Sequence, residues 1–93
     1  MTTRAPWLVT QVRDGDSFAT SSGREIRLAN VCAPEKGRTG FDLAKQRLEA
    51  LILNRNVRIV SVATDIYGRM VANVYSGSVH VNARMRSHGY TCS

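Results

Sequence analysis

The 93-residue sequence has few of the features that mark disulfide-rich, membrane-spanning or repetitive proteins. Its two cysteines are too few for a disulfide framework, and they do not have zinc-ligand spacing. No apolar run approaches the roughly 20 residues of a membrane-spanning helix, so we expect no membrane partner. Repeats, linkers and low-complexity segments are also lacking. These absences leave one small domain, residues 1–93, built around a single core.

The cysteines and the N-terminus bear on the cellular compartment. We expect Cys32 and Cys92 to be free thiols, with a single bridge between them as the alternative. The segment Met1–Pro6 lacks the apolar core of a signal peptide. We therefore expect a soluble, cytoplasmic protein, with a secreted mature form as the alternative. The oligomeric state stays open.

Lysine is scarce, and the basic residues are nearly all arginine. Thirteen basic against seven acidic residues give a net charge of +6, and only Lys36 and Lys45 are lysines. An arginine grips phosphate with a planar fork of two hydrogen bonds, whereas lysine offers a point charge. The alternative is a solvated surface without a partner. Four of the seven acidic residues lie in turn-like motifs, which leaves the outer surface more positive, so we expect a polyanion as partner.

The hydrophobic pattern predicts five strands and two helices. The strands are expected at residues 7–13, 17–20, around Arg27, at 57–63 and at 70–75, because these stretches are rich in β-branched and aromatic residues. Apolar residues recur at helical spacing over Gly40–Leu53, with Thr39 and Asp42 resembling a capping box. A short helix over Val81–His88 is expected to end at Gly89.

This order of elements predicts the fold class. Five strands, with one helix between the third and fourth and a short C-terminal helix, indicate a mainly β protein with some α structure. We expect a five-stranded barrel of the oligonucleotide-binding (OB-fold) type, whose closure removes exposed edge strands. The expected core includes Phe41, Leu48, Ile52, Val60 and Met85. A change of parity after Ile59 predicts a β-bulge there.

The third strand carries the first functional candidate. Ile26 and Leu28 are expected to point to one side and Arg27 to the other. We expect the extended stretch to run on to Pro34, which cannot donate to a ladder. A cation, Arg27, and a carboxylate, Glu35, would then be fixed close together, an arrangement that phosphate chemistry could use.

Several motifs occur in a fixed order along the chain. They are Asp14-Gly15-Asp16-Ser17, Arg27-Leu28, Pro34-Glu35, Asp65-Ile66-Tyr67-Gly68-Arg69 and Val81-Asn82. Each alone is typical of an ordinary turn or a solvated side chain. In combination they give the chain a resemblance, from about Val9 to Tyr90, to the staphylococcal nuclease-like domains, also called thermonucleases.

The resemblance implies a five-stranded barrel that hydrolyses phosphodiester bonds of DNA or RNA with a divalent metal, commonly calcium. Arg27, Glu35 and Arg69 match the family's catalytic arginine, carboxylate and second arginine. Asp16 and the Ala33 carbonyl match metal ligands. These types suit the reaction, because cations stabilise the charge that builds on the phosphate and a carboxylate orients or deprotonates water.

Two further residues complete the comparison with the family. Tyr67 matches a tyrosine that contacts the nucleotide phosphate. Cys32 stands where the family has a second carboxylate ligand, and a thiol is a poor calcium ligand. We therefore expect calcium to be weakly held. Cys32 is expected to form a thiolate only for a softer metal, and the alternative is that it is a small apolar filler at a strand end.

Two alternatives to a nuclease follow from this departure. One is a nucleic-acid-binding module that keeps the barrel and the positive groove but has lost catalysis. The other is a protein-interaction domain on the same scaffold. Arg27, Glu35 and Arg69 together favour the nuclease, because a groove meant only for phosphate has no use for a carboxylate. Cys32 favours the binding module.

Overall fold

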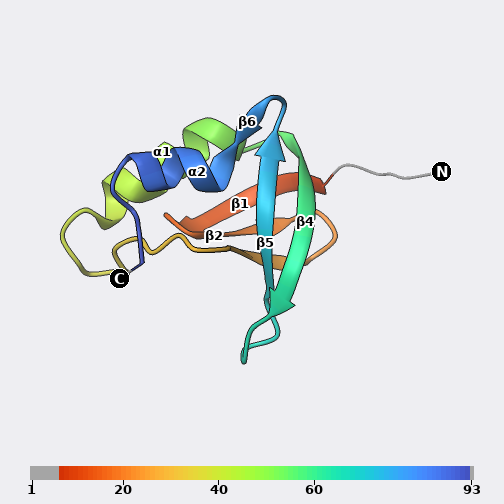
Figure 1. The fold of residues 1–93 in the computed structure, drawn as a ribbon, viewed down its shortest axis with the longest axis horizontal. Coiled ribbons are helices and arrows are strands. Elements are labelled where there is room, and N and C mark those ends of the chain that lie inside the picture. Colours follow the sequence, from red (N-terminus) through yellow and green to blue (C-terminus); the bar gives the residue numbers. More distant parts are fainter. Residues whose placement is uncertain (1–6, 93) are drawn as a thin grey trace.

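The computed structural model describes residues 7–92. Its elements are β1 (Trp7–Asp14), β2 (Ser17–Thr20), β3 (Glu25–Leu28), α1 (Phe41–Ile52), β4 (Asn56–Thr64), β5 (Met70–Ser76), β6 (Val79–His80) and α2 (Val81–Ser87). Figure 1 shows the curved sheet with both helices at one end of it. Within the described residues, neither helix has the length and apolarity of a membrane span. The N-terminal segment that bears on a signal peptide lies outside the described residues.

The strands form a closed barrel. Their order is β3-β2-β1-β4-β5-β6, with antiparallel neighbours throughout. A parallel pairing of β3 with β5, in which Arg27 lies opposite Val71, closes the ring. The predicted fold class, a mainly β five-stranded barrel with two helices, is confirmed. The two-residue strand β6, which hairpins back on β5, was not expected from the sequence.

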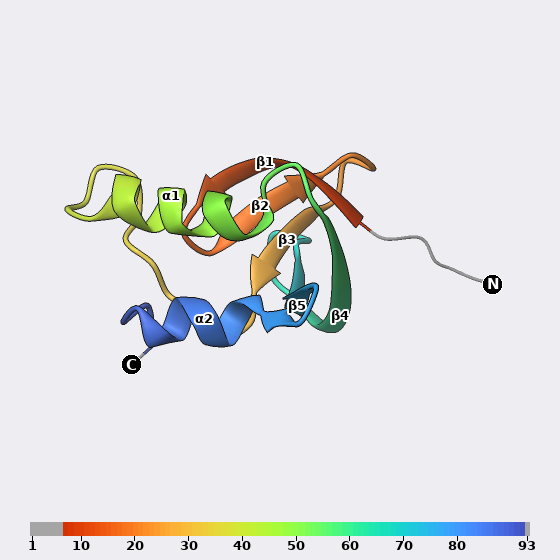
Figure 2. The same ribbon diagram turned by 90° about the horizontal axis from the view of Figure 1, so that it is seen from above.

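The core fills the barrel and is covered by the helices. Buried strand residues include Val9, Val12, Phe18, Ile26, Leu28, Val57, Ala72 and Val74. Figure 2 shows α1 running beside β1 and β2, with α2 on the β5 side. Leu48 and Ile52 of α1 and Met85 of α2 are fully buried. Burial of each such side chain contributes roughly 1.5–3 kcal/mol to the free energy of unfolding. The prediction that these three belong to the core is confirmed.

Other local expectations were wrong. The residue before α1 is Gly40 at φ 89°, without a side-chain cap, so the Thr39 capping box does not form. Phe41 is only partly buried. Val60 is 41% exposed, because it lies opposite Asn73 on the outer face of β4, and the register shift comes later than predicted, between Ser61 and Ala63.

A buried asparagine ties α2 to the barrel. The Asn82 side chain is fully buried, and its Oδ1 accepts the Val74 N–H at 2.8 Å. Its Nδ2 donates to the carbonyls of Ala29 and Ala72, at 3.1 and 3.0 Å. Asn82 thus fixes the start of the segment that follows β3, and that segment carries part of the site.

Candidate active site

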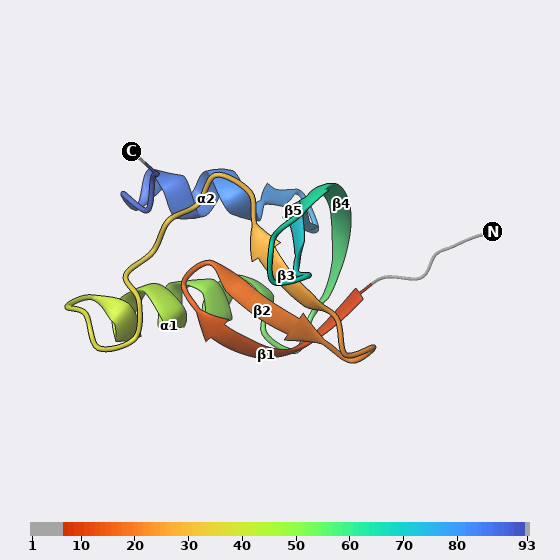
Figure 3. The same cartoon turned by 90° about the horizontal axis from the view of Figure 1, so that it is seen from below.

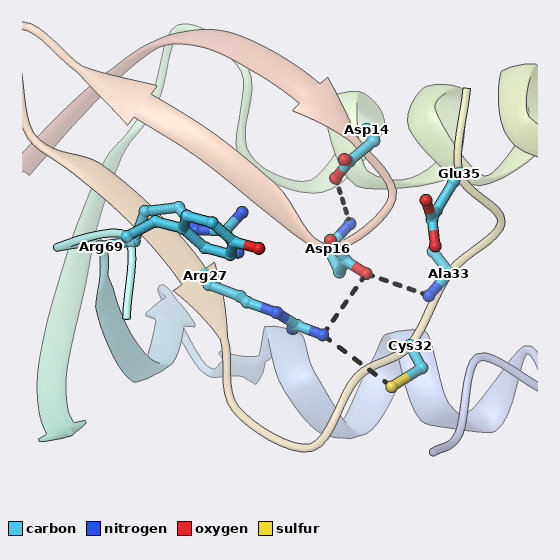
Figure 4. A pocket seen from close by; sticks show the side chains of 8 residues that line it. Asp14, Asp16, Arg27, Cys32, Ala33, Glu35 and Arg69 are labelled. Atoms are coloured by element: carbon cyan, nitrogen blue, oxygen red, sulfur yellow. Dashed lines mark hydrogen bonds and ion pairs between the residues drawn. The ribbon is translucent and has the colours of Figure 1, made fainter. Parts of the chain in front are cut away.

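A cleft of about 380 Å³ gathers every site residue that the sequence predicted. It is lined by Asp14, Asp16, Arg27, Cys32, Ala33, Glu35, Tyr67 and Arg69. Four segments meet there: the β1–β2 turn, strand β3, the segment after β3, and the β4–β5 turn (Figure 3). Figure 4 shows the side chains converging from these elements. Residues far apart in sequence therefore share one small volume.

The β1–β2 turn places Asp16 in the cleft. Asp14 Oδ1 accepts the Asp16 N–H at 3.0 Å and the Ser17 hydroxyl at 2.8 Å, which closes the turn on itself. Gly15 is needed for packing, because a Cβ there would lie 2.6 Å from the Cβ atoms of both Ala33 and Ala44. The turn is thereby pressed onto α1 and onto the segment after β3.

Arg27 is held mainly by backbone carbonyls. Its Nη1 donates to Leu28 O at 2.9 Å and to Val31 O at 3.0 Å. Those carbonyls converge because the chain turns directly after β3, with Asn30 at φ 59°. The expectation that the extended stretch runs on to Pro34 was therefore wrong. The Arg27 guanidinium remains in the cleft, with Nη2 3.8 Å from Asp16 Oδ2 (Figure 4).

Asp16 has an unfavourable environment for its charge. Burial, together with the neighbouring Asp14 carboxylate, raises the pKa of Asp16 to about 6. The Ala33 N–H, 3.1 Å from Oδ2, and the Arg27 cation act in the opposite direction without restoring the ordinary pKa. The cleft therefore holds a carboxylate whose negative charge is incompletely compensated.

Arg69 is held by its own turn. Asp65 Oδ2 accepts the Arg69 Nε–H at 2.7 Å, and Asp65 Oδ1 accepts the backbone N–H groups of Tyr67 and Arg69, both at 2.9 Å. Desolvation acts to raise the Asp65 pKa, but the three donors and the Arg69 charge together lower it below its ordinary value. The Arg69 Cζ lies 5.5 Å from the centre of the Tyr67 ring, whose residue is 77% exposed.

Glu35 lies on the opposite wall from the two arginines. It follows Pro34 in an exposed segment, and its carbonyl accepts the Arg38 N–H at 2.9 Å. Figure 4 shows its carboxylate beside Ala33, on the side of the cleft that Asp16 faces. The side chain is thus open to water while its backbone is held by a turn.

The cysteines are joined, and the expectation of two free thiols was wrong. Cys32 and Cys92 form a disulfide, and the Cys32 N–H donates to Tyr90 O at 3.1 Å. The bridge fastens the C-terminal segment to the wall of the cleft. A disulfide sulfur carries no negative charge, so in this state Cys32 supplies no thiolate to a metal. Arg27 Nη2 lies 3.9 Å from the Cys32 sulfur.

The donor set does not fit a calcium site. Calcium takes about six to eight oxygen ligands, with several carboxylates where binding is tight. Within residues 7–92, no three acidic, histidine or cysteine side chains converge closely enough to hold a metal ion. Asp16 and the Ala33 carbonyl supply too few oxygens, and one oxygen of Asp14 is committed to its own turn. The described residues therefore do not favour the expected calcium site, and calcium binding stays a prediction for titration to test.

Three residues at or near the cleft were not assigned to the site from the sequence. Asp14 was treated as a turn residue, yet it lines the cleft and adds negative charge beside Asp16. Asp65 was treated as part of a turn, yet it orients Arg69; its spacing of four residues from the arginine was the available signal. Cys92 entered the sequence analysis only through the alternative of a bridge to Cys32, and nothing in its neighbourhood placed that bridge beside the cleft.

Comparisons with known proteins bear on the family of the chain. The family model described as "Staphylococcal nuclease homologue" matches residues 25–93. A Haemophilus influenzae protein named "Uncharacterized endonuclease" is 31% identical over 85 residues, which are 87% of this chain and 48% of that protein. A Shigella flexneri protein named "Micrococcal nuclease" is 34% identical over 71 residues, covering 73% of this chain and 41% of that protein.

A third relative has a different kind of name. "Protein ParB" of Escherichia coli is 30% identical over 82 residues, covering 85% of this chain and 44% of that protein. The chain thus spans less than half the length of these curated relatives. The family model nevertheless matches most of the chain, including Arg27, Glu35 and Arg69. The chain belongs to the family of staphylococcal nuclease homologues.

Proposed function

We propose that the chain is a nuclease that hydrolyses phosphodiester bonds of DNA, RNA or both in this cleft. The observation that carries the proposal is the meeting of Arg27, Glu35 and Arg69, from three separate segments, around one cavity. Membership in a nuclease family and relatives named as nucleases support it.

The two arginines would stabilise the transition state. Attack on the phosphorus spreads negative charge over the non-bridging oxygens, and fixed cations then bind the transition state better than the substrate. Arg27 is held by two carbonyls and Arg69 by Asp65, so neither guanidinium needs to reorganise during the reaction. Each retains donors for a phosphate oxygen, because an arginine has five N–H groups.

Glu35 would act on the attacking water. Its exposed carboxylate faces the cleft, where it would orient a water molecule and accept its proton as the new P–O bond forms. The ester P–O bond on the far side of phosphorus then breaks, and the departing oxygen takes a proton from solvent in the open cleft. This division of labour needs only residues that the structure brings together.

The experiment compares the wild-type protein with Glu35→Gln on single-stranded DNA and RNA. Each is assayed with calcium, magnesium, manganese or a chelator. We expect Glu35→Gln to lower cleavage by roughly 10²- to 10⁴-fold with near-normal binding, because the change removes a base and adds no bulk. Equal cleavage by both proteins would refute the proposal. Calorimetric titration with calcium tests the metal separately.

A second candidate is a binding module without catalysis. The observation in its favour is that Cys32, at the position of a family carboxylate ligand, forms a disulfide and so supplies no charged ligand to a metal. Tight binding of oligonucleotides without cleavage under any metal would select it.

We also infer that the chain works in an oxidising compartment. Disulfides persist in secreted and periplasmic proteins and are rare in the cytosol. The bridge between Cys32 and Cys92 therefore favours the secreted alternative over the cytoplasmic expectation. Isolation of the protein from its cells under thiol-trapping conditions tests this: free thiols in the native pool would contradict it.

A further inference from the structure

A ladder of planar side chains lies away from the cleft, across the neighbouring strands β4, β5 and β6. The Arg58 guanidinium lies 4.4 Å from the centre of the Tyr75 ring. The His80 ring stacks on Tyr75, with centroids 4.7 Å apart and planes 16° from parallel. His80 Nε2 also bonds Asn73 Oδ1 at 3.1 Å. We refer to Arg58, Tyr75 and His80 as the aromatic ladder.

A second cleft adjoins the ladder. It has a volume of about 360 Å³ and is lined by Ser78, Val79, His80, Ala83, Arg84 and Ser87. His80 belongs to both the ladder and this cleft. The lining combines an exposed arginine with serine hydroxyls and contains no carboxylate. The sequence after Asp65 contains no Asp or Glu, so the elements around this cleft bring no acidic side chain of their own. The surface therefore favours an anion.

The outer face of β5 connects the two clefts. Ala72 and Val74 are buried, so Val71, Asn73 and Tyr75 alternate with them on the outer side. Two positions before Val71 stands Arg69, which lines the candidate active site. Figure 1 shows the β4–β5 turn and β6 at opposite ends of β5. At about 3.3 Å per residue, the five steps from Met70 to Tyr75 span roughly 17 Å.

We propose that the aromatic ladder and Arg84 form a second contact for single-stranded nucleic acid, used by nucleotides beyond those held in the active-site cleft. Stacked aromatic rings and guanidinium planes accept bases of any sequence, and nearby cations hold the backbone. Stacked nucleotides rise about 3.4 Å each, so roughly five bridge the distance. The proposal relies on the proposed function for the nature of the ligand but does not require cleavage.

The test measures binding against oligonucleotide length, in chelator so that no cleavage occurs. The probes are a thymidine dinucleotide and oligothymidylate and oligouridylate of about 12 nucleotides. Arg58 and His80 cover the two faces of the Tyr75 ring, so a base stacks on the outer members of the ladder, which Tyr75 holds in place. We expect Tyr75→Leu to remove this support and to weaken binding of the long probes roughly 5- to 100-fold, the usual range for loss of one base stack, while leaving the dinucleotide within about twofold. Tyr75→Phe, which keeps the ring, should bind like the wild type. A loss confined to DNA or to RNA would identify the nucleic acid that uses the surface.

The charged residues give a test that does not perturb the fold. Arg58 and Arg84 are exposed, and Arg58→Gln and Arg84→Gln should each lower the log–log salt slope for the long probes by about 0.7 if the guanidinium contacts a phosphate. Arg24→Gln is the matched control, because Arg24 also lies over an aromatic ring, that of Trp7 at 5.8 Å, but lines neither cleft.

Three results would overturn the proposal: equal losses on long and short probes, no loss in any ladder variant, or the same loss in Arg24→Gln. Thermal unfolding of each variant is measured beside binding. If Tyr75→Leu is unfolded, the two arginine variants decide the question. Absence of cleavage by the wild-type protein with any metal would refute the nuclease and leave the length-dependent result standing.

Discussion

The two arginines of the candidate active site reach the same cleft in different ways. Arg27 comes from a barrel strand and is held by the carbonyls of Leu28 and Val31, which depend on the chain path between β3 and the Cys32–Cys92 bridge. Arg69 comes from a turn and is held by Asp65, four residues away. The Arg27 side of the site therefore depends on tertiary structure, whereas the Arg69 side is largely preformed by local sequence. Changes to the two sides should have different consequences.

The largest expected effect is the loss of the bridge. Replacing both cysteines, Cys32→Ser with Cys92→Ser, opens a loop of 60 residues, and chain entropy then predicts a loss of about 4 kcal/mol in the free energy of unfolding. Activity at temperatures where the variant is folded should fall as well, because the loop that holds Arg27 is no longer linked covalently to the C-terminal segment. Denaturant unfolding and initial cleavage rates measure the two effects. An unchanged unfolding midpoint would show that the bridge does not anchor this wall.

The next effect separates the arginines themselves. Arg27→Ala and Arg69→Ala should each lower turnover by at least about 10²-fold, because their charge acts mainly on the transition state. Arg27→Ala should also destabilise the fold by about 1–3 kcal/mol, since the carbonyls that it bonds lose a partner. Arg69→Ala should leave stability nearly unchanged. Equal stability losses in the two variants would contradict the division between tertiary and local support.

The division between local and tertiary support also explains which parts of this site could be predicted from the sequence. The Asp65–Arg69 turn and the Asp14–Ser17 turn are local patterns, and the structure places both at the cleft as expected. The barrel was predictable because its strands are short stretches rich in β-branched and aromatic residues, separated by turn sequences. The end of β3 at Leu28 was not, because it depends on the left-handed conformation of Asn30.

The bridge was only the alternative to two free thiols, for a related reason. The pairing of Cys32 with Cys92 requires α2 to return the chain to the cleft, and α2 is placed by the buried Asn82 side chain.

Val60 was assigned to the core because the alternation of apolar residues seemed to shift at this position, whereas the register shift falls two residues later. The sequence pattern thus missed the consequences of long-range placement, together with local details such as the start of α1 and the position of the register shift in β4.

A smaller effect is expected from loosening Arg69 without removing it. Asp65→Asn keeps the size of the side chain but weakens its grip on the Arg69 Nε–H and on the two backbone N–H groups. We expect turnover to fall about tenfold, because the guanidinium loses its preset orientation. Steady-state cleavage should show the loss mainly in kcat. Asp42→Asn on the exposed face of α1 is the control, and an equal loss there would indicate a general charge effect.

The smallest effects are opposite responses of the two sides to acid. Burial raises the pKa of Asp16 to about 6, so between about pH 4 and 6 the folded state holds a proton that the unfolded state has lost. Stability from this group is present below pH 4 and falls, by an amount on the order of 1 kcal/mol, as pH rises through 6. The pKa of Asp65 is lowered, so its contribution to stability is present above pH 4 and is lost as pH falls.

Denaturant unfolding in chelator, from pH 3 to 7, should therefore show that Asp16→Asn removes a decline in stability toward neutral pH. Asp65→Asn should instead remove a decline toward acid. Parallel profiles for the two variants would show that the carboxylates do not differ in the way their surroundings imply.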